Sequence, residues 1–137
     1  MKRLLLIMLI CLTSFTLQAG EGKVAGSVEL IGQKEKTKSL QGALFVILRN
    51  LGKTKGAPVA VVKIDNPTFP TKFKVTEKNI MIRGKSFTGP FWISAKFVPD
   101  ANPLGEGQYY GVLQPEEGIA IGSSKVKVKL KGKKTED

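Results

Sequence analysis

The sequence lacks histidine altogether, and its single cysteine, Cys11, lies in the apolar run near the N-terminus. These two residue types supply most zinc, copper and haem ligands, and histidine supplies most proton shuttles at neutral pH. Their absence from the rest of the chain argues against a metalloprotein, a thiol enzyme or a serine hydrolase with a histidine base. We therefore expect a protein that is not an enzyme and that needs no cofactor.

The N-terminus has the three parts of a secretory signal peptide. Lys2 and Arg3 precede an apolar run, residues 4–12, and a more polar stretch ends at Ala19. The apolar run is shorter than the ~20 residues that a membrane-spanning helix needs. We expect residues 1–19 to be a signal peptide and the product to be periplasmic or secreted. A leader that is kept as a membrane anchor is the alternative.

The remaining residues have the length of one domain. Residues 20–131 are expected to fold together, and the polar residues 132–137 are expected to form a disordered tail. With no cysteine beyond the leader, disulfides cannot stabilise this domain, so its stability must come from an apolar core.

Apolar and polar residues alternate over most of this domain, and Gly, Pro and Asn recur at short intervals. Helix is expected only as a turn or two between Thr76 and Met81. The pattern predicts an all-β fold, an antiparallel β-sandwich of about seven strands with immunoglobulin-like or cupredoxin-like architecture. Residues 43–48 and 58–65 are apolar almost throughout, which is typical of strands covered on both faces. The expected strands are residues 24–30, 43–48, 58–65, 69–75, 91–98, 108–113 and 125–130.

Lysine accounts for most of the formal net charge of +11. One face of the last predicted strand would carry a row of lysines, because four of them alternate with apolar residues: Lys125, Lys127, Lys129 and Lys131. Such a row could face an anionic membrane surface or an acidic protein. It could instead protect an exposed sheet edge against aggregation. The scarcity of arginine and the export signal argue against nucleic acid.

Four residues are candidate anchors for a protein partner: Trp92, Tyr109, Tyr110 and Met81. Aromatic residues and methionine are enriched at protein interfaces. Trp92 and Met81 could instead fill the core of the domain. The oligomeric state stays open.

Several strand and turn segments carry a resemblance to a known family: Gly26–Leu30, Leu44–Arg49, Gly56–Lys63, Phe69–Phe73, Phe91–Lys96 and Gly107–Gly111. Together they resemble the C-terminal β-domain of c-type cytochrome maturation factors of the CcmI/CycH type. The resemblance implies a periplasmic domain without enzymatic activity. In that family the domain accompanies a membrane anchor and tetratricopeptide repeats that present apocytochrome for haem attachment.

These observations lead to one main hypothesis and two alternatives. The main hypothesis is a periplasmic binding or assembly module that assists cytochrome c maturation through protein contacts, its partner being that machinery or an exported client. The first alternative is a lysine-rich binder of anionic envelope surfaces. The second is a small-ligand carrier of cupredoxin-like shape that lacks type 1 copper, since that site requires histidine and cysteine.

Overall fold

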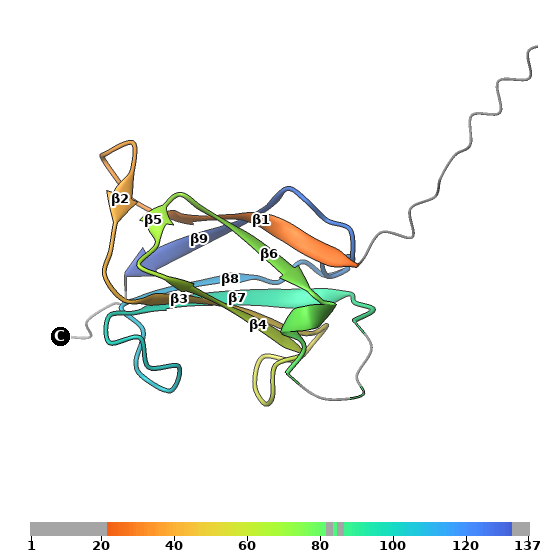
Figure 1. The fold of residues 1–137 in the computed structure, drawn as a ribbon. Helices are drawn as coiled ribbons and strands as arrows, with labels where there is room; N and C mark the ends of the chain where they lie inside the picture. The colour runs from red at the N-terminus through yellow and green to blue at the C-terminus, as the bar shows by residue number, and fades with distance from the viewer. Residues whose placement is uncertain (1–21, 82–83, 85–86, 133–137) are drawn as a thin grey trace, which may run out of the picture.

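The computed structural model describes residues 22–81, 84 and 87–132, and these residues are mostly in strands. One turn of 3-10 helix, η1 (Glu77–Asn79), begins at the capping residue Thr76. The predicted all-β fold with little helix is confirmed (Figure 1). The strands are β1 (Lys23–Leu30), β2 (Lys38–Ser39), β3 (Ala43–Asn50), β4 (Ala60–Asp65), β5 (Thr68–Phe69), β6 (Thr71–Thr76), β7 (Phe91–Val98), β8 (Tyr109–Leu113) and β9 (Val126–Gly132).

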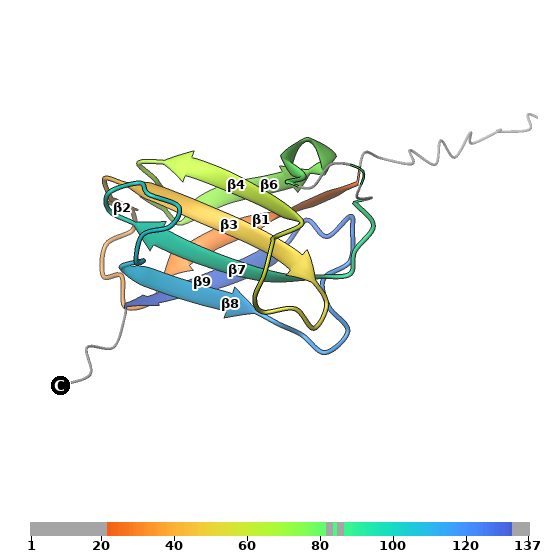
Figure 2. The ribbon, with the colours of Figure 1, turned by 90° about the horizontal axis from the view of Figure 1, so that it is seen from below.

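Seven of these strands form one continuous sheet in the order β4-β3-β7-β8-β9-β1-β6. The sheet curls until its two ends, β4 and β6, contact one another, so that it is nearly closed as a barrel (Figure 2). The short strands β2 and β5 pair separately. The predicted leader, residues 1–19, lies outside the described residues. So does the predicted tail, apart from Gly132, which ends β9.

The predicted strand arrangement needs two corrections. β1 and β9 run parallel, from Gly26 opposite Val126 to Leu30 opposite Leu130, so the sheet is mixed rather than wholly antiparallel. The sandwich is not confirmed, because the strands belong to one curled sheet. Alternation within a strand specifies its buried face but not the direction or identity of its neighbours, and both corrections concern neighbours.

The inside of the barrel is filled by apolar side chains from all seven main strands. Phe97 lies deep in this core, with its ring edge-on to Phe69 at a centroid distance of 6.4 Å. No polar or charged side chain is buried in the described part of the chain. The main members of the core are Val24, Val28, Leu30, Leu44, Val46, Leu48, Phe69, Phe73, Val75, Phe91, Ile93, Phe97, Val126, Val128 and Leu130.

The two continuously apolar segments differ in their surroundings. β3 lies between β4 and β7, and its other face buries Ala43 and Phe45 in a small second cluster, so it is covered on both faces as predicted. β4 lies at one end of the sheet order, and its Lys63 and Asp65 are exposed. The prediction of two covered faces is therefore wrong for this half of β4, although Val61 nearer its start packs against the second cluster.

Glycine allows β9 to lie close to both of its neighbours. A Cβ atom on Gly26 of β1 would lie 1.9 Å from the carbonyl oxygen of Val126, and one on Gly111 of β8 would lie 2.3 Å from that of Lys129. Real Cβ atoms do not approach backbone atoms so closely. The position of β9 in the sheet therefore depends on the absence of side chains at these two residues.

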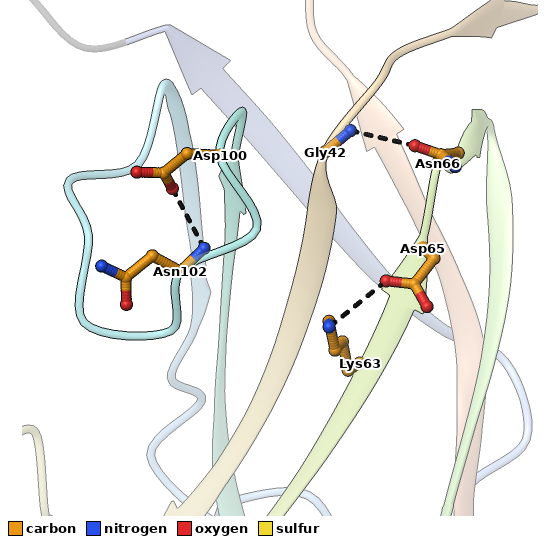
Figure 3. Close-up of polar contacts among 6 residues, drawn as sticks. All are labelled: Gly42, Lys63, Asp65, Asn66, Asp100 and Asn102. Carbon is orange, nitrogen blue, oxygen red and sulfur yellow. Dashed lines mark hydrogen bonds and ion pairs between the residues drawn. The ribbon is translucent and has the colours of Figure 1, made fainter.

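Asn66 fixes the turn between β4 and β5 (Figure 3). Its backbone N–H donates to the carbonyl oxygen of Gly42 (2.8 Å), and its side-chain Oδ1 accepts from the N–H of Gly42 (3.1 Å). Its φ of 45° lies in the left-handed region, where asparagine is among the tolerated residues. Figure 3 also shows the exposed Lys63–Asp65 ion pair (3.4 Å).

We expect Asn66→Ala to lower the free energy of unfolding by about 2 kcal/mol, because the variant loses a hydrogen bond and places an alanine at positive φ. Asn66→Gly should lose only about 1 kcal/mol, since glycine adopts this φ without strain. Urea denaturation of both variants measures the difference. Equal losses would mean that the backbone conformation contributes nothing.

Candidate binding surface

The predicted lysine row is exposed on the outer face of the barrel. Lys125 directly precedes β9, and Lys127, Lys129 and Lys131 lie on it, while the residues between them point into the core. β9 is not an edge strand, because it pairs with β1 on one side and with β8 on the other. The interpretation of the row as edge protection is therefore wrong.

Apolar side chains lie beside one end of this row. A groove of about 480 Å³ is lined by Ile31, by Tyr110, Gly111 and Val112 of β8, and by Lys129 and Lys131. We call it the β8–β9 groove. Ile31 is 52% exposed, Tyr110 41% and Val112 63%. The structure thus brings the predicted anchor Tyr110 together with two of the predicted lysines, and Lys131 is its partner in the strand register.

The other tyrosine has a different role. Tyr109 packs against the core, and its ring centroid lies 6.1 Å from that of Phe97. It is therefore not part of the exposed surface that contains Tyr110. The hydroxyl of Tyr110 accepts a hydrogen bond from the backbone N–H of Gly107 (2.6 Å), which fixes the ring over the preceding loop.

Trp92 lies on the outer side of β7 and is half-buried. Its Nε1–H donates to the carbonyl oxygen of Pro115 (2.9 Å). It lines a small pocket of about 160 Å³ together with Arg49, whose Nη1 donates to the hydroxyl of Ser94 (3.3 Å). The interpretation of Trp92 as a core residue is wrong. The core side of β7 is filled by its neighbours Phe91 and Ile93.

We expect Trp92→Phe to lower the free energy of unfolding by about 1 kcal/mol, because the carbonyl of Pro115 loses its donor while most of the ring packing is kept. Thermal and urea denaturation followed by circular dichroism measure this, since the variant has no tryptophan fluorescence. An unchanged stability would show that water can replace the indole N–H as donor to the carbonyl of Pro115 with no loss of free energy.

Met81 is 61% exposed, so its interpretation as a core residue is wrong. Its backbone N–H donates to the carbonyl oxygen of Val59 (2.9 Å), which places it beyond η1 and next to the start of β4. It does not line the β8–β9 groove. Met81 and Tyr110 therefore do not line the same groove.

A second groove, of about 600 Å³, lies on the other side of the lysine row. We call it the β6–β9 groove, because Lys72 and Lys74 of β6 line one part of it and Lys125 and Lys127 line another. The sequence prediction missed the two lysines of β6. Their alternation with the buried Phe73 is a signal of the same kind as that of the β9 row, but only the strand pairing reveals that the two sets meet.

Residues 22–81, 84 and 87–132 contain no group of three or more acidic, histidine or cysteine side chains that could hold a metal ion. They also contain no helix with the length and apolar character needed to cross a membrane.

Comparison with known proteins gives few matches. No protein-family model matches the chain. An uncharacterized protein of Aquifex aeolicus (strain VF5) is 27% identical over 92 residues, which are 66% of this chain and 61% of that protein. The chain thus spans about three fifths of the length of this relative. Among solved structures, an alternative pilotin from the type II secretion system of Vibrio cholerae has a similar fold, with a TM-score of 0.51 and 13% identity over 82% of this chain and 97% of the pilotin.

Proposed function

We propose that this chain is an exported, non-enzymatic protein-binding module of the cell envelope, and that a partner docks at the β8–β9 groove. The observation that carries the proposal is the group of large apolar side chains exposed there: Ile31, Tyr110 and Val112. Exposed apolar side chains that share one groove are typical of interaction sites, whereas scattered ones are not. The lysines at its margin match the polar rim that surrounds the apolar centre of an interface.

Two further observations support this proposal. The leader-like residues 1–19 favour export. The fold likeness to a pilotin from a type II secretion system favours a role among protein partners over catalysis. The strand resemblance suggests which partner is bound. It would be a component of the cytochrome maturation machinery or an exported client. Neither the pilotin nor the Aquifex protein is described as a cytochrome maturation factor.

Two other functions have less support: binding of an anionic envelope surface and carriage of a small ligand. Binding of an anionic membrane surface would use the lysine row, and salt would weaken it strongly. A small-ligand carrier of cupredoxin-like shape gains no support from the two grooves described above, which lie on the outer surface of the barrel.

The double variant Ile31→Ala and Val112→Ala tests the docking site. We expect its affinity for the envelope partner, and with it the capture, to fall about thirtyfold, since each truncation removes on the order of 1 kcal/mol of apolar contact. Crosslinking in the envelope, purification and mass spectrometry measure capture and identify the partner. Recovery of haem-attachment proteins would specifically support the cytochrome form of the proposal.

The matched control is Leu51→Ala with Leu104→Ala, which also removes two exposed apolar side chains but outside the groove. Its capture should equal that of the wild type. An equal decrease in both double variants, or none in either, would contradict the proposed docking site.

A further inference from the structure

We infer that the β6–β9 groove binds an extended acidic segment of a protein partner, with Asp or Glu at alternate positions. This assignment rests on the proposed function and adds the chemistry of the segment that is recognised. The site is distinct from the β8–β9 groove, because the two grooves share no lining residue and contact different lysines of the β9 row.

The groove follows from side-chain size on three adjacent strands. β1 lies between β6 and β9, and its lining residues Ala25, Gly26 and Ser27 are small. Ser27 has Lys72 as its register partner on one side and Lys127 on the other. Ala25 has Lys74 as its partner on β6. Small residues therefore form the floor, and long lysines rise on both sides.

The dimensions favour an extended chain. Neighbouring strands lie about 4.8 Å apart, so the two lysine-bearing strands on either side of β1 are separated by about 10 Å. An α-helix with its side chains is 10–12 Å across, and it would not enter between the lysines. An extended segment is narrower and can lie along the floor.

The spacing of charges agrees with this geometry. Lys72 and Lys74 are two residues apart, as are Lys125 and Lys127, which is about 6.6–6.8 Å along a strand. Side chains at alternate positions of an extended peptide have the same spacing and point to the same side. A segment with Asp or Glu at every second position could therefore place its carboxylates against the lysines in register.

The four lysines of the groove form no ion pair within the described part of the chain. None of the residues that line the groove is acidic. The one ion pair found in residues 22–81, 84 and 87–132 is Lys63–Asp65, which involves none of the four lysines. Four exposed ammonium groups around one groove repel one another, and a polyanionic ligand would relieve that repulsion.

The concave shape favours a peptide over a membrane. A bilayer surface extends far beyond a groove whose lysine-bearing strands are about 10 Å apart, so it would meet the tips of the lysines before the floor at Ala25 and Ser27. A peptide can contact both, with carboxylates on the lysines and its backbone near Ser27. Membrane binding is the alternative that the experiment below distinguishes from peptide binding.

The test measures fluorescence anisotropy of a labelled peptide that alternates glutamate and valine, with protein purified after export of the full chain. The double variant Lys72→Glu and Lys74→Glu should bind this peptide about tenfold more weakly than the wild type. The matched control is Lys53→Glu with Lys55→Glu, which changes net charge equally in the β3–β4 loop and should stay within about twofold. A peptide of the same composition with its glutamates in one block should bind the wild type several-fold more weakly.

Three results would overturn the inference: no binding of the alternating peptide, equal weakening in both double variants, or equal affinity for the two peptides. Flotation with phosphatidylglycerol vesicles is the second measurement. Vesicle binding that depends on Lys72 and Lys74, without peptide binding, would assign the groove to the membrane instead. Both lysines are exposed, so thermal denaturation should confirm that each variant folds.

The outcome is separable from that of the proposed function. If Ile31→Ala with Val112→Ala loses partner capture while Lys72→Glu with Lys74→Glu keeps capture and peptide affinity, only the present inference fails. If peptide binding depends on the lysines but capture does not depend on the apolar pair, the docking site of the proposed function fails instead.

Discussion

Replacement of Phe97 by alanine is expected to lower the free energy of unfolding by about 3–5 kcal/mol. Phe97 lies on β7, which has β3 and β8 as neighbours, and its side chain is fully buried. Its ring contacts Phe69 edge-on and lies near Tyr109, so its removal leaves a cavity between three strands. The free energy of unfolding of a small domain is only about 5–15 kcal/mol, so this variant would lose a large part of its stability.

Urea denaturation followed by Trp92 fluorescence or circular dichroism measures this loss. The control is Leu104→Ala, because Leu104 is 93% exposed and its truncation should change stability by less than about 0.5 kcal/mol. A loss below about 1 kcal/mol for Phe97→Ala would be incompatible with a ring in the centre of the core.

The second large effect is expected for Gly26→Ala, which should cost about 3 kcal/mol although it adds only a methyl group. The new Cβ would lie 1.9 Å from the carbonyl oxygen of Val126, and this atom is backbone and cannot rotate away. β1 and β9 would have to separate where they pair in parallel. The same shift would distort the floor of the β6–β9 groove, since Gly26 is part of it.

Gly132→Ala is the matched control, because it is the same substitution near the end of β9. The nearest atom to its Cβ is a ring carbon of Tyr109 at 3.9 Å, an ordinary van der Waals contact. Urea denaturation should separate the two variants by at least about 2 kcal/mol. Hydrogen exchange should in addition become faster for the amides of β9 in Gly26→Ala. If both variants are equally stable, β9 does not need the close approach.

The sequence was informative about what each strand buries. Phe69, Phe73 and Val75 alternate with polar residues, and the structure buries all three, because side chains of a strand point to opposite faces in turn. The same rule correctly predicted that the β9 lysines are exposed. These are local properties, and the residues themselves determine them.

Strand neighbours depend on contacts between distant parts of the chain, and there the sequence was less informative. The parallel pairing of β1 with β9 joins residues about 100 positions apart, and no local pattern encodes it. Because strand neighbours cannot be predicted locally, the sequence did not indicate that Lys72 and Lys74 lie beside the β9 lysines. The alternative that places Trp92 in the core is wrong for another reason: the outer side of β7 offers the carbonyl of Pro115 as a hydrogen-bond acceptor, so an indole is stable outside the core.

The parallel pairing of the first and last strands also sets the order of events in folding. β9 supplies the connection between β8 and β1, so the barrel cannot close until the final strand has been synthesised and is available. Until then β8 and β1 each present an unpaired edge, which is a template for association with other chains. Contacts of such large sequence separation also form slowly. Before β9 pairs, β8 and β1 are therefore the places where association with other chains is expected to begin.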